Sequence, residues 1–440
     1  MHRTILIAVL SALPVFGMTL EEAVDTALRN RNDIAAARLD LSSAEWRNRS
    51  ADLWFLPSVS FTAAFVRSHD ISTMELPGLG SIPLGSEYAS RAGITAAVPL
   101  FTARGLAGSS LTGISEDISD YSLTAAEQDA TLDVIRSFHG VLLATELERV
   151  ASEALETAKE GFEIASRRYE AGTISRFEML ESSVAYENRK PEALAASSAL
   201  ANARAALAVA VGLTGTSGVP VEGSLSDPIP VTLPSSLEEA DRLMRENSPE
   251  IRTASAMREA GDASVRLAGA AFAPSVVLQT EYAWQAARDD WHFDTEDYER
   301  NWSTTLAVEI PIFNQLNDIA SYQTARADRL ASNARADDIE SYSELGLVQA
   351  WNDLLQARES VSATEATVAI AEEGSSIARV SYEAGVITRL EMDQAFLALT
   401  ASRTNHATAL YGLRVAEARL ARMTGLLEFG NDTSTHGKAL

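Results

Sequence analysis

An internal duplication constrains this fold more than any other feature of the sequence, because two copies of one pattern build two copies of one structural unit. The segment Leu20–Ala23 recurs as Leu237–Ala240, 217 residues later (237 against 20). Further along, Gly161–Ser182 matches Gly374–Ala395, and half of the aligned positions are identical. The chain therefore consists of two tandem repeats.

The two repeats end alike and are separated by a segment with the composition of a linker. Leu213–Gly215 resembles Met423–Gly425, and the residues between the repeats are rich in glycine, proline and serine. The expected domains are a signal peptide at 1–17, repeat 1 at 18–214, a linker at 215–234, repeat 2 at 235–426 and a polar C-terminal tail at 427–440.

Helical patterns open and close each repeat. Thr19 and Ser236 are candidate N-caps, and the first helix is expected to run from Thr19 to Leu53. Two longer helices follow in each repeat, separated by a Tyr-Glu-Ala-Gly sequence, and their spacing predicts an antiparallel coiled coil. Pro191 occurs only in repeat 1 and predicts a bend or step there. The long helices are expected at about 102–169, 175–213, 315–382 and 388–424.

Between the first helix and the long helices, the hydrophobic period becomes two, which predicts strands. In repeat 1, Val59, Phe61 and Phe65 alternate with small or polar residues, so that one face of the strand is apolar. The expected strands are at about 57–67, 90–101, 274–285 and 302–313, and the loops within the hairpins at 69–87 and 287–301.

Four such strands leave their apolar face uncovered. A soluble sandwich shows the same alternation, but it needs more strands, and no predicted helix is placed to cover this face. Lipid covers such a face in a transmembrane barrel, with aromatic residues such as Trp284 and Trp302 near the interfaces. Because four strands cannot close a barrel, three protomers would supply twelve strands with no free edge.

Composition and the N-terminus narrow the class of protein further. The formal charge of −25 argues against nucleic-acid binding, and it fits either a lumen that favours cations or a solvated exterior. The absence of cysteine removes disulfides, thiolate metal sites and a lipidated N-terminal cysteine, so we expect no lipoprotein. A basic start followed by the short apolar stretch Thr4–Phe16 predicts a signal peptide cleaved after Gly17. No later apolar run reaches the length of a transmembrane helix.

The sequence shows no constellation typical of an enzyme or of a cofactor site. The six histidines are scattered, and no pair has the spacing of metal ligands. No phosphate-binding loop, nucleophile elbow or dinucleotide fingerprint is present, so we expect no catalytic, cofactor-binding or metal-binding residue. The alternatives to an export duct are a periplasmic coiled-coil scaffold and a general diffusion porin.

The order of these motifs resembles the TolC-type outer-membrane efflux protein family over essentially the whole mature chain. The resemblance is carried by the duplicated helix start, the entries to and exits from the hairpins, and the two Tyr-Glu-Ala-Gly turns. The entries are Leu56–Pro57 and Ala273–Pro274, the exits are Val98–Phe101 and Ile310–Phe313, and the turns begin at Tyr169 and Tyr382.

The resemblance implies an α+β membrane protein that acts as the outer-membrane duct of a tripartite efflux or type I secretion system. It implies a homotrimer in the outer membrane of a Gram-negative-type bacterium. Long coiled-coil helices would form an α-barrel that extends into the periplasm, and four strands per chain would form a twelve-stranded β-barrel in the lipid. A periplasmic adaptor protein and an inner-membrane transporter would complete the system, and the duct itself would conduct passively.

In this family the two helix-turn-helix tips dock the adaptor and close the pore. The adaptor-docking candidates are Tyr169, Gly172, Thr173, Gly385 and Val386. Relative to the family pattern, Ile387 stands at the arginine position and Gln394 at the second acidic position. The gate candidates are Tyr382, Arg389, Glu391, Asp393, Arg176, Glu178 and Glu181. These acids either form rings around the pore that attract cations, or Glu178 and Glu391 pair with Arg176 and Arg389 on a solvated tip.

Overall fold

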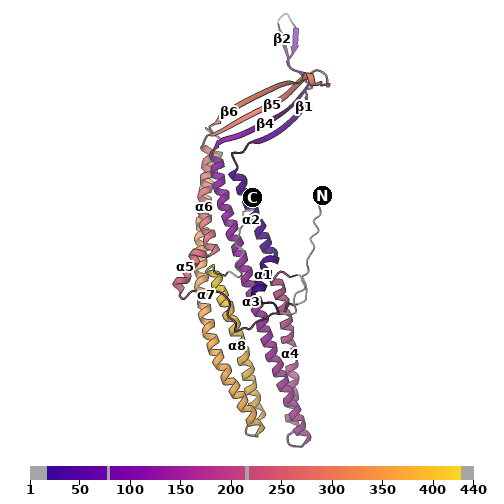
Figure 1. The fold of residues 1–440 in the computed structure, drawn as a ribbon, viewed down its shortest axis with the longest axis vertical. Coiled ribbons are helices and arrows are strands. Elements are labelled where there is room, and N and C mark those ends of the chain that lie inside the picture. The colour runs from indigo at the N-terminus through magenta and orange to yellow at the C-terminus, as the bar shows by residue number, and fades with distance from the viewer. Residues whose placement is uncertain (1–16, 77–79, 214–217, 428–440) are drawn as a thin grey trace. The chain divides into compact units, whose positions relative to one another are not determined.

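The computed structural model describes residues 17–76, 80–213 and 218–427, and Figure 1 shows the course of the chain. The described chain divides into two compact units that are interleaved in sequence. The helical unit takes the described residues of Met1–Asp40, Asp120–Thr253 and Asp338–Leu440, and the strand unit takes those of Leu41–Ser119 and Ala254–Asp337. The predicted signal peptide and polar tail lie outside the described residues, except for Gly17 and Leu427.

The strand unit contains one four-stranded antiparallel sheet with the order β1-β4-β5-β6. The central pairing of β4 with β5 joins the two repeats, for example at Ile94 opposite Tyr282, and it has a register shift between Pro99 and Phe101. The two outer strands, β1 and β6, are edges of this sheet. The strand bounds are β1 Ser58–Arg67, β4 Tyr88–Thr102, β5 Ser275–Arg288 and β6 Glu299–Glu309.

Two details of the strands differ from the expected pattern. The loop of the first hairpin contains a small hairpin of its own, β2 (Thr73–Leu76) paired with β3 (Gly80–Pro83). The last strand ends at Glu309 and not at residue 313, because Pro311 has no N–H to continue a ladder and Gln315 and Leu316 adopt positive φ values of 46° and 65°.

The edge strands leave large apolar side chains uncovered in the single chain. Every residue of β1 and of β6 is exposed. Among them are Val59, Phe61, Phe65, Trp302, Leu306 and Val308. The sheet therefore has two open edges and an apolar surface that something outside the single chain must cover.

The opening helix of each repeat is broken into two, which corrects the expectation of one helix from Thr19 to Leu53. The backbone is extended at Arg31 and at Ser248. At Ser248 the break is favoured by the proline that follows, because the residue before a proline avoids the α conformation. The helices are α1 Leu20–Asn30, α2 Asn32–Asp52, α5 Leu237–Asn247 and α6 Pro249–Gly269, and a 3-10 turn, η1, follows at Ala270–Phe272.

A glycine at the end of each repeat packs against these breaks. Gly212 and Gly425 have φ values of 74° and 71°, and a Cβ on either would lie 2.9 Å or less from the backbone at Asn30 or Asn247. The structural equivalent of Gly425 is therefore Gly212, and not Gly215 as the resemblance of the repeat ends implied.

The long helices form two hairpins with a constant offset of 213 residues (389 against 176). They are α3 Ala103–Glu170, α4 Arg176–Ala210, α7 Asn317–Glu383 and α8 Arg389–Met423. Helix α4 continues through Pro191, so the predicted step is not a break in the helix. Contrary to expectation, α4 contains a stretch that is long and apolar enough to cross a membrane by composition. Only 17% of that stretch is buried in the single chain.

The core of the helical unit is built from both repeats and from the segment between them. Leu225 and Ile229, which belong to the segment expected to be a linker, are buried in this core, and Val221 forms a bridge with Met18. Arg414 of α8 donates hydrogen bonds to the backbone oxygens of Leu225 and Ser226. The described part of this segment is therefore a packed strap.

Candidate functional site

The two helix-turn-helix tips, which contain the expected docking and gate residues, both lie in the helical unit. Each turn is a Schellman motif, in which the residue after the glycine donates its N–H to a carbonyl five residues earlier. Thr173 donates to Arg168 at 2.9 Å and Val386 donates to Ser381 at 2.9 Å. Gly172 and Gly385 have φ values of 72° and 74°, which allow the reversal.

The side chains around these turns are largely exposed. Val386 is 77% exposed and Tyr169 is 39% exposed. Among the described residues, nothing lies within 4 Å of an ideal Cβ at Gly172 or Gly385. The docking candidates therefore form a small, open, partly apolar surface on each tip.

Glu391 serves the start of α8 and does not pair with Arg389. Its Oε2 accepts hydrogen bonds from the Thr388 N–H at 2.7 Å and from the Thr388 hydroxyl at 2.9 Å. The Thr388 Oγ1 in turn accepts from the Glu391 N–H, which completes a capping box. These hydrogen bonds lower the pKa of Glu391. The interpretation that Glu391 pairs with Arg389 is therefore wrong.

Arg389 pairs with Asp393 instead. Its Nε lies 2.9 Å and 3.0 Å from the two carboxylate oxygens of Asp393, one helical turn later. The guanidinium also lies 5.9 Å from the ring centroid of Tyr382, and the guanidinium of Arg168 lies 5.5 Å from the same ring. Tyr382 is therefore contacted by one cation from its own repeat and one from the other repeat.

The Arg389 side chain fills the space that Gly161 leaves open on α3. A Cβ at Gly161 would lie 2.8 Å from Nη2 of Arg389, which is closer than real contacts allow. The arginine side chain is only 12% exposed. We call Arg389, Asp393, Tyr382, Arg168 and Gly161 the tip latch, because their contacts join the first turn of α8 and the end of α7 to α3.

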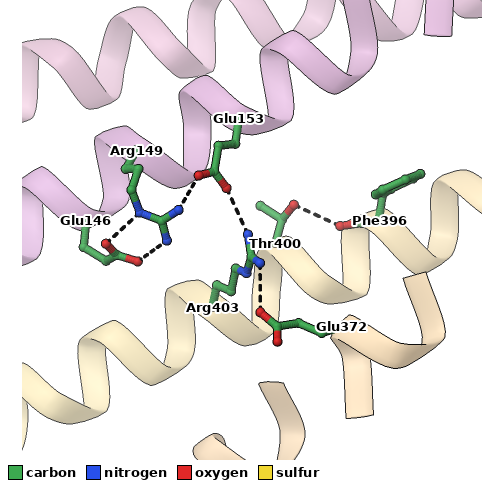
Figure 2. A network of polar contacts seen from close by, with 7 residues as sticks. All are labelled: Glu146, Arg149, Glu153, Glu372, Phe396, Thr400 and Arg403. Carbon is green, nitrogen blue, oxygen red and sulfur yellow. Dashed lines mark hydrogen bonds and ion pairs between the residues drawn. The ribbon is translucent and has the colours of Figure 1, made fainter. Parts of the chain in front are cut away.

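A second polar cluster joins the same helices farther along the hairpins (Figure 2). Arg403 of α8 donates from Nη1 to Glu153 of α3 at 2.9 Å and from Nη2 to Glu372 of α7 at 2.8 Å. Glu153 also accepts a hydrogen bond from Arg149, whose other donors bind Glu146. Each pair is partly exposed and is worth at most about 1 kcal/mol alone, so the value of the cluster lies in fixing the geometry of three helices.

A cleft of about 400 Å³ lies between the two clusters and is lined by α3, α4 and α8. Ala154 and Ala158 of α3 line one side, and Met392 and Phe396 of α8 line another. Small residues of α3 thus face larger residues of α8 across this cleft.

The structure brings together only some of the expected gate residues. Tyr382, Arg389 and Asp393 are in one cluster, and Glu391 stands apart at its cap. Arg176, Glu178 and Glu181 lie on the exposed first turns of α4, and no contact between them and the latch is seen within the described residues. Nor do the described residues contain a group of three potential metal ligands.

Residues that sequence reasoning missed include Arg168, Gly161, Arg403 and Glu153. Comparison of the two repeats could have pointed to Glu153. Position 153 is glutamate in repeat 1 and its equivalent, residue 366, is alanine, so a charge is present on one side only.

Comparison with known proteins agrees with the geometry. The family model described as "Outer membrane efflux protein" matches residues 23–213 and 242–426, which covers both repeats. The cobalt-zinc-cadmium resistance protein CzcC of Cupriavidus metallidurans is 26% identical over 430 residues, which is 94% of this chain and 93% of that protein. Protein CyaE of Bordetella pertussis is 26% identical over 70% of this chain and 64% of its own length.

Solved structures show the same fold. The Campylobacter jejuni CmeC outer membrane channel superimposes with a TM-score of 0.79 at 16% identity, over 94% of this chain and 87% of that one. The structure of CusC superimposes with a TM-score of 0.76 at 20% identity, over 92% of each chain. The paired long helices, the four antiparallel strands and the two repeats are confirmed, and so is the resemblance inferred from the sequence. This chain belongs to the outer membrane efflux protein family, and it is the non-enzymatic outer-membrane channel, extending into the periplasm, of a tripartite efflux or type I secretion system.

Proposed function

We propose that three copies of this chain form one continuous duct, which conducts its cargo passively from an inner-membrane transporter to the exterior. The observation that carries the proposal is the sheet β1-β4-β5-β6 with its two open edges and its exposed apolar residues. Pairing of β6 in one copy with β1 in the next removes both edges, and three copies give twelve strands. Lipid then covers the apolar face.

The helical hairpins would extend into the periplasm as an α-barrel, with the tips as the free end. A periplasmic adaptor would dock on the open surfaces at Tyr169, Gly172 and Thr173 of one tip and at Gly385 and Val386 of the other. The transporter in the inner membrane would supply the energy, since nothing in the described residues of the duct offers chemistry of its own.

The tip latch would hold the closed state of the pore. Arg389 is held in its orientation by Asp393 and Tyr382, and its guanidinium occupies the gap at Gly161 of α3. Moving the α7–α8 hairpin away from α3 would therefore empty that gap and separate Arg168 from Tyr382. The remaining carboxylates, Glu178, Glu181 and Glu391, would each occur three times around the axis and make the entrance favour cations.

Planar-bilayer recordings of the detergent-extracted protein test this proposal. Arg389→Ala and Tyr382→Ala remove parts of the latch and are expected to raise the conductance. Glu391→Ala is expected to weaken the preference for cations. Arg167→Ala is the matched control, because Arg167 is an exposed arginine beside the latch.

Two results would overturn the proposal at different levels. A protein that stays soluble and monomeric without detergent is incompatible with a membrane duct. Wild-type conductance and selectivity in all three variants would remove the assignment of the gate, while the duct would stand.

A further inference from the structure

The loop between β5 and β6, residues 289–298, folds back onto the sheet, and we call it the β5–β6 loop. The hydroxyl of Tyr298 donates a hydrogen bond to Oγ of Ser90 at 2.9 Å. The ring centroid of Phe293 lies 5.9 Å from that of Phe65 and 6.1 Å from that of Tyr298. Two aromatic side chains thus attach the loop to β4 and β1.

Charged side chains provide further attachments. Nη1 of Arg288, the last residue of β5, donates to Oδ2 of Asp297 at 2.6 Å, and Nε of Arg288 lies 3.4 Å from Oδ1 of Asp290. Asp289 accepts a hydrogen bond from the N–H of Glu87 at 3.3 Å. Three carboxylates of this acidic loop are therefore paired with groups at the end of the sheet.

The sheet residues that hold the aromatic rings and Asp297 all belong to the apolar face. Phe65 is on the same face of β1 as Phe61, because alternate residues of a strand share a face. Ser90 lies directly opposite Phe65 in the register. Arg288 lies opposite Tyr88, two residues from Ser90, and hence on that face as well. The loop therefore lies on the face that carries the large apolar side chains, and not on the small polar face.

Arg300 marks where this face leaves the hydrocarbon layer. It lies opposite Trp284, which shares the face of Arg288 because four residues separate them. A charged side chain on the lipid-facing side of a barrel is costly at the middle of the bilayer and tolerated near its boundary. Phe65 lies one alternation beyond the row of Trp284, which is about 7 Å along the strand. The contact between Phe293 and Phe65 is therefore at the level of the headgroups.

The position and composition of the loop fit that level. The loops within the hairpins are at the opposite end of the sheet from the long helices, so they lie at the extracellular end. Trp291 of the β5–β6 loop is 66% exposed. Trp and Tyr gather at the boundary between lipid and water, because their rings are apolar while their N–H and O–H groups can be hydrated. An exposed tryptophan outside the barrel wall at this level is suited to lipid headgroups.

We propose that the β5–β6 loop is a membrane anchor, which lies outside the barrel in the headgroup layer of the outer leaflet and leaves the lumen uncovered. The inference rests on the proposed duct, because it takes the apolar face of the sheet to be covered by lipid. To close over the lumen instead, the loop would have to leave that face and break the contacts of Phe293, Tyr298 and Arg288 together. The exit of the duct is therefore open at this loop.

Because the chain has no cysteine, single introduced cysteines carry a nitroxide label without background. The labelled protein is reconstituted in vesicles of phosphatidylethanolamine and phosphatidylglycerol. The exposure of the label to oxygen, which concentrates in lipid, is compared with its exposure to a water-soluble nickel complex. Leu306→Cys reports the apolar face of β6, and Ser303→Cys reports its polar face. Trp291→Cys is expected to give an oxygen-to-nickel ratio between those of these two references.

Removing an attachment tests whether the sheet positions the loop. Phe293→Ala, added to Trp291→Cys, is expected to shift the ratio toward that of Ser303→Cys, because the loop loses its contact with Phe65. Phe101→Ala is the matched control, since Phe101 is an exposed phenylalanine opposite Val276, at the other end of the sheet. It is expected to leave the ratio at residue 291 unchanged. A label at Leu306→Cys should keep its ratio in the Phe293→Ala protein, which shows that the barrel is intact.

The results that overturn the anchor and the duct are different. If Trp291→Cys has the ratio of Ser303→Cys while Leu306→Cys is exposed mainly to oxygen, the loop is in water, and the anchor is wrong while the duct stands. If Leu306→Cys is itself exposed mainly to the nickel complex, lipid does not cover the sheet, and both proposals are wrong. An unchanged ratio after Phe293→Ala would overturn the role of the aromatic contact in holding the loop at the membrane.

Discussion

The contact between Gly425 and the break that separates α5 from α6 predicts a large and specific loss of stability for Gly425→Ala. Gly425 has a φ of 71°, and an added Cβ would lie 2.6 Å from both the carbonyl carbon and the oxygen of Asn247. Ordinary carbon contacts are about 3.5–4.0 Å, so the backbone at the break would have to move by roughly 1 Å.

Two costs combine in this variant. The left-handed conformation costs about 1–2 kcal/mol for alanine, and overpacking against atoms that cannot rotate away costs about 1–3 kcal/mol. Gly385→Ala separates the two costs, because Gly385 has a φ of 74° and open space around it among the described residues. Its expected loss is only the first, about 1–2 kcal/mol.

Thermal unfolding of both variants in detergent, followed by far-ultraviolet circular dichroism, measures the difference. At about 2–4 °C per kcal/mol, Gly425→Ala should have a Tm roughly 2–12 °C below that of Gly385→Ala. Equal Tm values would refute the reasoning, since they would mean that the helix break yields without cost. Gly212→Ala against Gly172→Ala repeats the comparison in the other repeat.

Three further predictions concern buried charge, burial of a base and a helix cap. Burial raises the pKa of Glu250, but its hydrogen bond and ion pair with Arg422 outweigh that effect and lower the pKa overall. The stabilisation from this pair is therefore present above the unfolded pKa of Glu250 and is lost as pH falls through its folded pKa. Glu250→Gln should cost about 1–3 kcal/mol at neutral pH and flatten the acid side of a Tm-against-pH curve. An unchanged curve would contradict the pairing. Burial also lowers the pKa of His139, so stability should fall as pH drops below the unfolded value of about 6.5, and His139→Leu should remove that step from the same curve. Thr388→Ala should cost about 1 kcal/mol and speed amide hydrogen exchange in the first turn of α8, with Thr367→Ala on exposed α7 as control; equal exchange in both would argue against the capping box.

The larger elements of this fold could be predicted from the sequence because each has a local cause. Thr19 and Ser236 cap their helices through hydrogen bonds to a residue three positions later, which sequence spacing reveals directly. The alternation around Phe61 marks a strand for a similar reason. The break at Arg31 has no such local signal, because the backbone of Gly212, about 180 residues away in sequence, packs against it.

Only part of the candidate gate site could be predicted from the sequence. The expected residues lie within the turn and the first helical turns of each tip, and in the second tip the pairing of Arg389 with Asp393 follows from their spacing of four. Arg168 and Gly161 belong to the other hairpin, and their approach depends on how the helices pack. Such contacts are set by tertiary structure, so the family pattern around Ile387 could not locate them.

The number and direction of the strands in the sheet determine how many copies of the chain can close a barrel. Each copy contributes an even number of strands, and its first and last strands run in opposite directions. Any number of copies can therefore close a ring in which every neighbouring pair is antiparallel, since parity never forces a parallel join. Strand direction alone therefore permits a ring of three, four or five copies equally well. The choice of stoichiometry is thus left to the angle at which the helical hairpins of successive copies meet, so a change in copy number should be sought in mutations of these hairpins and not in the strands.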